Sequence, residues 1–513
     1  LGLTEQASRS ALAIVADCLQ PKRALLVLDN CEHLIQACAQ LAETLLRACP
    51  TLHLLATSRE GLGIAGETPY LVPALTTPDP TRANFETLTQ YEAVRLFVER
   101  AQTALPGFAL TVDNTPAVAQ VCHQLDGIPL ALELAAARVK ALRVEQIASR
   151  LDDRFDLLTG GSRTALPRLQ TLRAAMDWSY NLLSEDERLL LQRLSVFAGG
   201  CTLEAAEAVC SGEGLEAGRI LDGLASLAAK SMILADRRQG DETRYRMLET
   251  IRQYASERLN ESGDGERLRR RHLEFFLRWA ERTEPELRGA QQLEWLSQIV
   301  AEHDNLRAAL EWGLAQADCG EASLRLAGAL LSFWSQRGHV SEGRAWLARA
   351  LANPAAPRAG AARAKALYVA GTLAHWQGGN TARALLEESA GLWQVLGSAG
   401  KNGLAYALAT LSEAMREWGD PATARSLASE AAGLFREQDD RWGLAYALSN
   451  LGLAIRDQED FALARSVINE SVTLWRDLGD QWGLRLVTCY LGEVALRQGD
   501  YEVAQRHFAD CLE

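Results

Sequence analysis

Long hydrophobic runs are missing from this chain of 513 residues. No apolar stretch approaches the roughly 20 residues that a membrane-spanning helix needs, and the opening sequence LGLTEQASRS lacks the regions of a signal peptide. Basic charge is also in short supply, because 53 Lys and Arg are outnumbered by 66 Asp and Glu, which gives a net charge of −13. This balance excludes a broad nucleic-acid-binding surface and permits only a small local one. We therefore expect a cytoplasmic protein with no membrane segment.

Motifs for metal binding and for disulfide frameworks are absent from the sequence as well. The 10 cysteines are scattered singly, with no C-x-x-C pair and no His at zinc-finger spacing. The 8 His residues form no H-E-x-x-H motif. We expect reduced, mostly buried thiols, and no metal ion other than Mg²⁺ carried by a nucleotide.

The length of the chain predicts several domains, because 513 residues are too many for one hydrophobic core. The chain begins at Leu1 instead of Met and stops inside a periodic segment. We expect it to be an internal piece of a longer protein.

Two short apolar runs near the start, residues 25–28 and 52–56, are separated by a helical pattern of apolar residues. Such a strand–helix–strand unit is expected to be parallel and right-handed. Parallel strands end on the same edge, so Asp29 should face the triplet TSR at 57–59 across the rim where open α/β sheets bind ligands. A carboxylate at the end of a buried strand needs a cation or a hydrogen-bond donor, and in phosphate-binding NTPases that partner is Mg²⁺.

Purely structural roles remain open for these residues. Asp29 or Asn30 could cap the helix that follows, and Arg59 could be a surface residue without a role. An Arg on this rim could instead reach a γ-phosphate with two hydrogen bonds. The second strand therefore favours a phosphate site.

After a Pro-rich connector at 72–80, amphipathic helices dominate to about residue 150. Within them the sequence Gly127-Ile128-Pro129-Leu130 interrupts the helical pattern before it resumes. Pro129 suits the first turn of a helix, so the start of a new helix alone would explain its presence.

Residues 177–260 show three helical patterns, followed by apolar runs at 232–236 and 243–248 that flank a polar turn. Three helices followed by a hairpin predict a winged helix. This segment holds 10 Lys and Arg against 14 Asp and Glu, a net charge of −4, and its third helix offers only Arg219 and Lys230 as cations. Direct DNA contact is not expected here, because phosphate neutralisation needs clustered cations.

The last third of the chain repeats itself. Asp420, Asp460 and Asp500 are spaced by 40 residues, and the sequence GLAYAL at 403–408 returns at 443–448. An internal period in this range predicts a stacked helical array that resembles tetratricopeptide repeats, whose usual period is about 34. The recurring Trp residues are expected in the core of the repeats.

Three of these pieces, in order, resemble the NB-ARC-like signal-transducing ATPases (the STAND class) of large bacterial transcriptional regulators. LLVLDNCEHL is similar to their Walker B strand, LLATSREGLGIAGE to their sensor strand, and GIPLAL to their GxP motif. The resemblance continues through RYRMLETIRQYASERL and EHDNLRAALEW into the repeats, and so covers nearly the whole chain.

The resemblance implies an ATP or ADP site with Mg²⁺. Asp29 would act on Mg²⁺, Arg59 would sense the terminal phosphate, and Pro129 would lie against the adenine. The remaining contacts would come from Thr57, Ser58 and Gly127.

Three departures from the family pattern limit these expectations. Asn30 stands where many relatives carry a second acid, a candidate catalytic base. Met247-Leu248-Glu249 replaces the Met-His-Asp of the eukaryotic relatives, so their His contact with ADP is not carried over. No G-x-x-x-x-G-K-[ST] occurs in the sequence, and the family places that loop upstream of Walker B. We expect this chain by itself to bind ATP weakly or not at all.

The sequence thus predicts a mostly α-helical, multidomain protein in five parts. They are a partial P-loop-type α/β nucleotide domain (1–80), a helical domain (81–160), a winged helix (161–262), a helical linker (263–320) and an α-solenoid of tetratricopeptide-like repeats (321–513). The leading hypothesis is a regulatory ATPase, at most a slow one, which receives a protein or small-molecule signal through the repeats and can self-associate when nucleotide binds. Its output, on DNA or through a cyclase, would come from a domain outside this chain. The alternative is a protein-interaction scaffold with a vestigial NTPase core.

Overall fold

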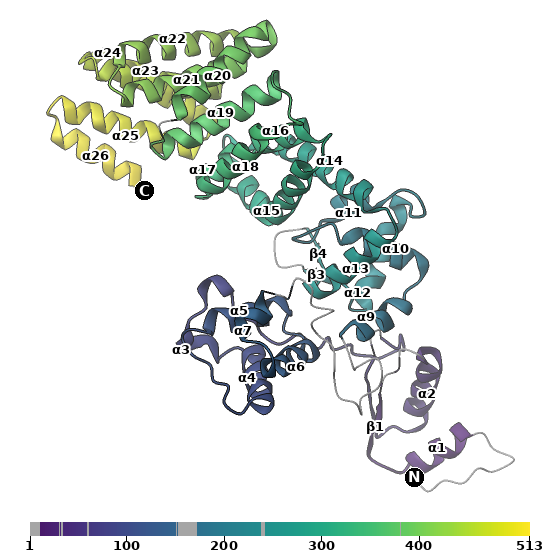
Figure 1. Cartoon of the computed structure of the whole chain (residues 1–513). Helices are drawn as coiled ribbons and strands as arrows, with labels where there is room; N and C mark the ends of the chain where they lie inside the picture. The colour runs from purple at the N-terminus through teal and green to yellow at the C-terminus, as the bar shows by residue number, and fades with distance from the viewer. Residues whose placement is uncertain are drawn as a thin grey trace. The chain divides into compact units, whose positions relative to one another are not determined.

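The computed structural model describes residues 11–29, 31, 34–58, 61–149, 151, 172–236, 242–379 and 381–512. Over these residues the protein is mostly α-helical, with two sheets of two strands each, as the sequence predicted (Figure 1). The chain forms two compact units, the first made of residues 1–196 and 200–265 and the second of 197–199 and 266–513. None of the described helices is long and apolar enough to cross a membrane. The finer division into five parts remains a prediction.

The first unit begins with the expected strand–helix–strand element. Strands β1 and β2 pair in parallel, with Ala24 opposite Leu52 and Leu28 opposite Ala56. Apolar side chains of the two helices cover one face of this sheet through residues such as Leu19 and Leu45. The elements are α1 (Ala11–Leu19), β1 (Ala24–Leu28), α2 (Ile35–Ala48) and β2 (Leu52–Ala56).

The other face of this sheet is open. Leu25, Val27 and Leu55 are 63%, 53% and 54% exposed. The expectation of a buried strand is therefore wrong for half of each strand. Parallel strands normally have both faces covered, and the α1 and α2 helices cover only one.

The helical part of the first unit has its own core. Phe97, Val118, Leu125, Leu132 and Ile147 are fully buried in it. Its elements are η2 (Pro80–Arg82), α3 (Phe85–Leu88), α4 (Glu92–Ala104), α5 (Thr115–Gln124), α6 (Pro129–Ala137), η3 (Arg138–Lys140) and α7 (Val144–Ala148).

The predicted winged helix is present. After its helices, β3 and β4 pair as an antiparallel hairpin with Leu234 opposite Arg246. Ser184 begins α10 with a reciprocal cap, because its hydroxyl accepts from Glu187 N while Glu187 accepts from Ser184 N. The elements are α9 (Leu172–Asn181), α10 (Glu185–Leu194), α11 (Leu203–Cys210), η6 (Ala217–Arg219), α12 (Ile220–Ala229), β3 (Leu234–Asp236), β4 (Arg244–Arg246) and α13 (Glu249–Glu261).

The second unit is helical throughout its described part (Figure 1). Its first elements are α14 (Gly265–Thr283), η7 (Pro285–Leu287), α15 (Gln292–Ala315), α16 (Gly320–Gly328), α17 (Leu331–Gln336) and α18 (Val340–Ala352). The array continues with α19 (Ala361–Trp376), α20 (Ala382–Val395), η8 (Gly397–Gly400), α21 (Lys401–Glu417), α22 (Pro421–Gln438), α23 (Arg441–Arg456), α24 (Phe461–Leu478), α25 (Gln481–Arg497) and α26 (Tyr501–Leu512).

The 40-residue period has a structural cause in helix capping. The carboxylates of Asp420, Asp460 and Asp500 each accept a hydrogen bond from the backbone N–H three residues later, at 3.0, 3.2 and 3.3 Å. Asp440 and Asp480 cap the intervening helices in the same way. An Asp at each of these helix starts satisfies N–H groups that lack a partner within the helix.

Small residues in the repeats mark close approaches of helices. A Cβ on Gly443 would overlap the ring of Phe435, and one on Gly483 would overlap the ring of Trp475. The sequence predicted that the recurring residues Trp376, Trp418, Trp442 and Trp482 lie in the core. This is wrong for Trp376 and Trp418, which are 41% and 44% exposed, while Trp442 and Trp482 are half-buried.

Two cysteines differ from the expectation of reduced thiols. Cys489 on α25 and Cys511 on α26 form a disulfide with a Cα–Cα distance of 5.8 Å. These helices are partners in one antiparallel pair, which brings together positions 22 residues apart. The other eight cysteines form no disulfide, and six of them are buried.

Candidate functional site

The ends of β1 and β2 meet on one rim, as expected for parallel strands. The hydroxyl of Thr57 donates a hydrogen bond to Oδ1 of Asp29. Backbone bonds fix the same corner, since Thr57 N donates to Leu28 O at 2.8 Å and Cys31 N donates to Thr57 O at 2.9 Å. The Asp29 side chain is exposed, so it is accessible to a cation from solvent. Carboxylate oxygens are the ligands that Mg²⁺ prefers, and the rim therefore fits this ion.

The other predicted members of this rim have different outcomes. Ser58 is partly buried beside Thr57. Asn30 and Arg59 lie outside the described residues, so their predicted roles stay predictions. The alternative that Asp29 caps the helix after the strand is wrong, because the N-cap residue of α2 is Leu34.

Gly127 and Pro129 belong to a tight turn between α5 and α6. Pro129 is the first residue of α6, as predicted from its preference for that position. Gly127 has φ +64°, and its carbonyl accepts a hydrogen bond from Leu75 N at 3.1 Å. A Cβ at this position would overlap the carbonyl group of Leu75. The turn thereby holds the connector that follows the sheet against the helical core.

A contact that the sequence did not predict joins this turn to the winged helix. Asp126, which has φ +54°, accepts hydrogen bonds through Oδ2 from Thr250 N at 2.9 Å and from Thr250 Oγ1 at 2.8 Å. Thr250 directly follows Met247-Leu248-Glu249, the stretch that replaces Met-His-Asp. The sequence did not predict this pair, because the residues are 124 positions apart and no spacing rule connects the two motifs beside which they stand.

The cations at the two ends of α12, Arg219 and Lys230, are paired with acids of α10. Lys230 contacts both oxygens of Glu187 at 2.8 and 2.9 Å, and Arg219 donates to Asp186 at 2.8 Å. Burial by itself would raise the pKa of Glu187, but hydrogen bonds from Lys230, Ser226 and Ser184 N outweigh it and lower this pKa to about 2. Both cations are thus held by carboxylates of α10.

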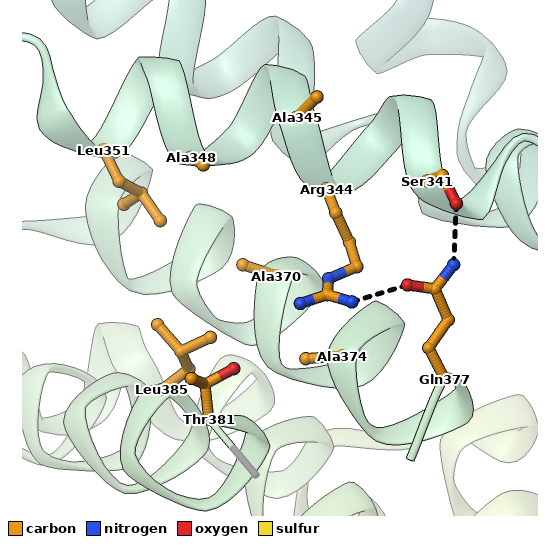
Figure 2. A pocket seen from close by; sticks show the side chains of 10 residues that line it. All are labelled: Ser341, Arg344, Ala345, Ala348, Leu351, Ala370, Ala374, Gln377, Thr381 and Leu385. Atoms are coloured by element: carbon orange, nitrogen blue, oxygen red, sulfur yellow. Dashed lines mark hydrogen bonds between the residues drawn. The ribbon is translucent and has the colours of Figure 1, made fainter. Parts of the chain in front are cut away.

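A cavity of about 460 Å³ lies among α18, α19 and α20 in the second unit (Figure 2). Its wall consists largely of alanines, and polar groups gather at one end. There Arg344 donates to Gln377 Oε1 at 2.5 Å, and Gln377 donates to Ser341 Oγ at 3.0 Å. A mostly apolar cavity with a few convergent polar groups suits a small ligand.

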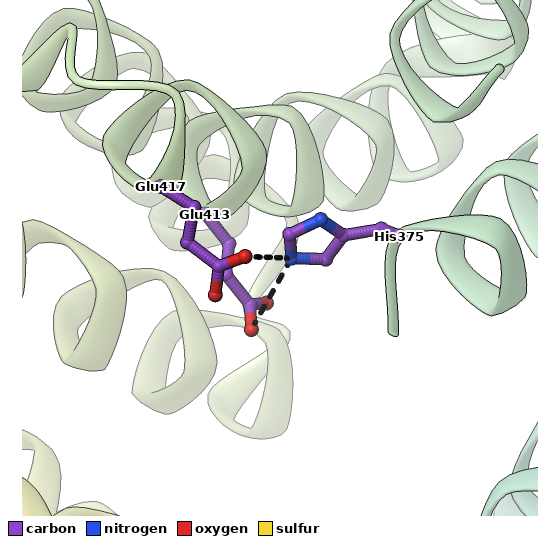
Figure 3. A group of neighbouring side chains, drawn as sticks. All are labelled: His375, Glu413 and Glu417. Atoms are coloured by element: carbon purple, nitrogen blue, oxygen red, sulfur yellow. Dashed lines mark ion pairs between the residues drawn. The ribbon is translucent and has the colours of Figure 1, made fainter. Parts of the chain in front are cut away.

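His375 on α19 faces two carboxylates of α21 (Figure 3). Its Nε2 lies 3.7 Å from Glu413 Oε1 and 3.8 Å from Glu417 Oε2. The imidazole is 4% exposed, whereas Glu417 is 50% exposed at the mouth of the cluster. Among the described residues, these three form the group whose donor atoms could hold a metal ion, all within 4.8 Å. The sequence search missed them because they are not close together in the chain.

We expect the charge of His375 to make the stability of the repeats pH-dependent. Burial lowers the pKa of the imidazole, but Glu413 and Glu417 outweigh burial and the nearby Arg416, so the pKa is raised above 6.5. A raised folded-state pKa stabilises the fold fully below the unfolded value and loses that stabilisation as pH rises through the folded value. In thermal unfolding followed by tryptophan fluorescence, the midpoint temperature of the transition of the repeats should therefore exceed that of His375→Gln most at pH 5.5, with the difference falling towards pH 9.

The difference between the wild type and His375→Gln at each pH cancels the effect of other titrating groups. One of these is His272, whose burial lowers its pKa to about 4. His53→Gln is the control, because this side chain is exposed on β2. A difference between wild type and His375→Gln that stays constant with pH would show that the imidazole is neutral throughout.

Two regions of this chain match models of known protein families. Residues 183–260 match the family model described as a winged helix-turn-helix domain, and residues 443–513 match a tetratricopeptide repeat model. A Mycobacterium tuberculosis protein named "Putative HTH-type transcriptional regulator" is 39% identical over 464 residues, which cover 86% of this chain and 49% of that protein. The chain is thus similar over most of its length to a protein named as a putative HTH-type regulator.

This relationship extends to further mycobacterial proteins. The Mycobacterium bovis protein of the same name matches equally well, and an uncharacterized Mycobacterium tuberculosis protein is 42% identical over 267 residues, or 52% of this chain and 65% of that protein. The chain spans about half the length of the HTH-type relatives. The findings agree with the resemblance to large bacterial transcriptional regulators that the motifs suggested.

Among solved structures, a STAND protein with a tetratricopeptide repeat sensor from Pyrococcus horikoshii aligns with 98% of this chain and 63% of its own. The sequence identity is 15% and the TM-score is 0.43. A TM-score this low does not establish a common fold over the whole length.

Proposed function

We propose that this chain belongs to a nucleotide-regulated transcriptional regulator, in which the repeats receive a signal and ATP or ADP sets the state. The pairing of Asp29 with Thr57 across the rim of parallel strands is the observation that carries the proposal. Asp29 would act on Mg²⁺, Arg59 would contact the terminal phosphate, and Asn30 would stand near the attacking water. Further nucleotide contacts would come from Ser58, Gly127 and Pro129.

The link between Asp126 and Thr250 supports a switching role for the winged helix. It joins the turn at Gly127 to the first turn of α13 through two hydrogen bonds. A nucleotide that prefers one arrangement of this link over another by a few kcal/mol would shift the population between two states. The cavity between α18 and α20 is where we place a small-molecule signal. Output on DNA would come from a part of the regulator outside this chain.

We expect Asp29→Ala and Arg59→Ala, each in the complete regulator, to weaken Mg²⁺-ATP binding by roughly tenfold or more and to abolish the response of a promoter reporter. Asp113→Ala is the matched control, because Asp113 is an exposed acid in the helical part. Binding is measured by titration with a fluorescent ATP analogue. This chain alone should bind the analogue weakly, since its 513 residues contain no P-loop motif.

The second candidate is a protein-interaction scaffold that no longer uses nucleotide. The match of residues 443–513 to a tetratricopeptide repeat model supports it. If both variants of the complete regulator bind ATP and drive the reporter like the wild type, the scaffold is the better description.

A further inference from the structure

A short segment before α15 is bound by the repeat helices as a peptide ligand would be. Residues 288–292 lie between η7 and the first turn of α15, and Arg288 has extended backbone angles of φ −119° and ψ 128°. Hydrogen bonds connect this segment to residues 118 to 191 positions later in the sequence. The segment and the repeats belong to the same compact unit.

The Arg288 side chain lies over two neighbouring aromatic rings, whose centres are 6.1 Å apart. Its guanidinium carbon is 4.8 Å from the ring centre of Tyr406 and 4.6 Å from that of Trp442. Nη1 also donates to the hydroxyl of Tyr406 at 2.6 Å, and this hydroxyl donates to Asp440 at 2.7 Å. Two neighbouring rings and an acid behind one of them select a guanidinium, which can stack and donate at once.

The backbone next to Arg288 is recognised by Asp480. This carboxylate is 2% exposed and accepts from Gly289 N at 3.0 Å, from Gln292 Nε2 at 3.3 Å and from Trp442 Nε1 at 2.9 Å. A buried carboxylate is costly unless it is hydrogen-bonded, and the segment provides two of its donors. Asp480 therefore binds the backbone of the segment at Gly289, while the rings of Tyr406 and Trp442 bind the side chain of Arg288.

The position after the arginine has room for glycine alone. Gly289 has φ +97°, and a Cβ there would lie 3.2 Å from the carbonyl oxygen of Leu478. On the other side Gly479 approaches Ala290, since a Cβ on Gly479 would lie 3.2 Å from Ala290 Cβ. The site thus fits an Arg-Gly sequence in an extended conformation.

We propose that Tyr406, Trp442, Asp440 and Asp480 form a binding site for an Arg-Gly segment of a protein partner, and that the chain's own Arg288-Gly289 occupies this site as an internal competitor. The partner would bind by displacing residues 288–292 from the repeats. This proposal gives the repeats a protein signal in addition to the small molecule that we place in the cavity, and so it rests on the proposed function. Its test needs neither nucleotide nor DNA, so the two can fail separately.

Binding of a free peptide to this site depends on how strongly the internal segment competes for it and on the protonation state of Tyr406. A covalently attached segment acts at an effective concentration of about millimolar. Burial raises the pKa of Tyr406 well above its ordinary value, which keeps the phenol neutral and able both to donate and to accept. A free peptide at micromolar concentration should therefore bind poorly until the internal arginine is removed.

The experiment uses the whole 513-residue chain. The probe is a fluorescein-labelled peptide with the sequence of residues 284–292, EPELRGAQQ, and binding is measured by fluorescence anisotropy. We expect Arg288→Ala to bind this peptide at least about tenfold more tightly than the wild type does, because the arginine position beside Tyr406 and Trp442 is then empty and the internal segment competes only through its contacts with Asp480. Trp442→Leu added to Arg288→Ala should remove the binding, and so should alanine in place of arginine in the peptide.

Arg349→Ala is the matched control variant. Arg349 also stacks on a tryptophan, with its guanidinium carbon 4.7 Å from the ring centre of Trp346, and it pairs with Glu311 at 2.8 Å. Its removal deletes a similar contact elsewhere in the unit, so this variant should bind the peptide as weakly as the wild type.

The proposal is overturned if folded Arg288→Ala binds the peptide no better than the wild type, or binds the arginine-free peptide equally well. If Arg288→Ala does not fold, millimolar unlabelled peptide is added to the wild type and tryptophan fluorescence is followed. Release of the guanidinium from Trp442 should change the emission with EPELRGAQQ and not with EPELAGAQQ. The absence of any difference between the two peptides would also overturn the proposal.

Discussion

Replacing Gly127 by alanine is expected to destabilise the helical part of the first unit by roughly 4 kcal/mol. Two costs add at this position. The φ of +64° strains any residue with a Cβ, and that Cβ would overlap the carbonyl oxygen of Leu75 while lying 3.0 Å from its carbonyl carbon. Because backbone atoms are on both sides of the overlap, no rotamer change relieves it. Either the turn or the connector at Leu75 has to move.

The measurement is hydrogen exchange followed by mass spectrometry on peptides from α4 to α6, because a chain of several domains does not melt in two states. Gly107→Ala is the control, since Gly107 has no atom within 4 Å of a new Cβ. The control should change exchange by less than about 1 kcal/mol. Equal protection in Gly127→Ala and Gly107→Ala would mean that the turn relaxes without cost. Displacement of the turn should also strain the neighbouring link from Asp126 to Thr250.

Trp475→Ala is expected to cost roughly 4 kcal/mol in the repeats, as large-to-small changes of buried aromatics do. Trp475 on α24 is fully buried, and its ring fills the space left by the missing side chain of Gly483. Its ring centre lies 5.2 Å from that of Trp442 in an edge-to-face arrangement. The change should therefore open a cavity beside the Arg288 site and increase hydrogen exchange in α23, α24 and α25.

Trp418→Ala serves as the control for this change. Trp418 follows the last residue of α21 and is 44% exposed, so its loss should cost less than about 1 kcal/mol. If both variants show the same exchange, the array tolerates a cavity by collapse of the neighbouring helices.

The sequence predicted those elements whose cause is local. The two parallel strands followed from short apolar runs, and the repeats followed from aspartates that cap successive helices. The exposure of Leu25 and Val27 was not predicted, because an apolar run shows which residues avoid water and not how many faces are covered. The disulfide between Cys489 and Cys511 was missed because no spacing rule identifies cysteines on paired helices.

The candidate site was predictable only in part, for a similar reason. Asp29 and Thr57 could be placed on one rim because the ends of parallel strands coincide. The links from Asp126 to Thr250 and from Arg288 to Tyr406 join positions 124 and 118 residues apart. Each depends on how helices pack, and a single sequence contains no signal for such a pair.

The open face of the first sheet bears on how the protein behaves at high concentration. Leu25, Val27 and Leu55 present adjacent apolar side chains on a pair of strands in which each strand is an edge. Unpaired strand edges and exposed apolar side chains both promote pairing with another molecule. Aggregation of this chain should therefore begin at residues 24–56, and a charged residue in place of Val27 should improve its solubility more than any change in the repeats.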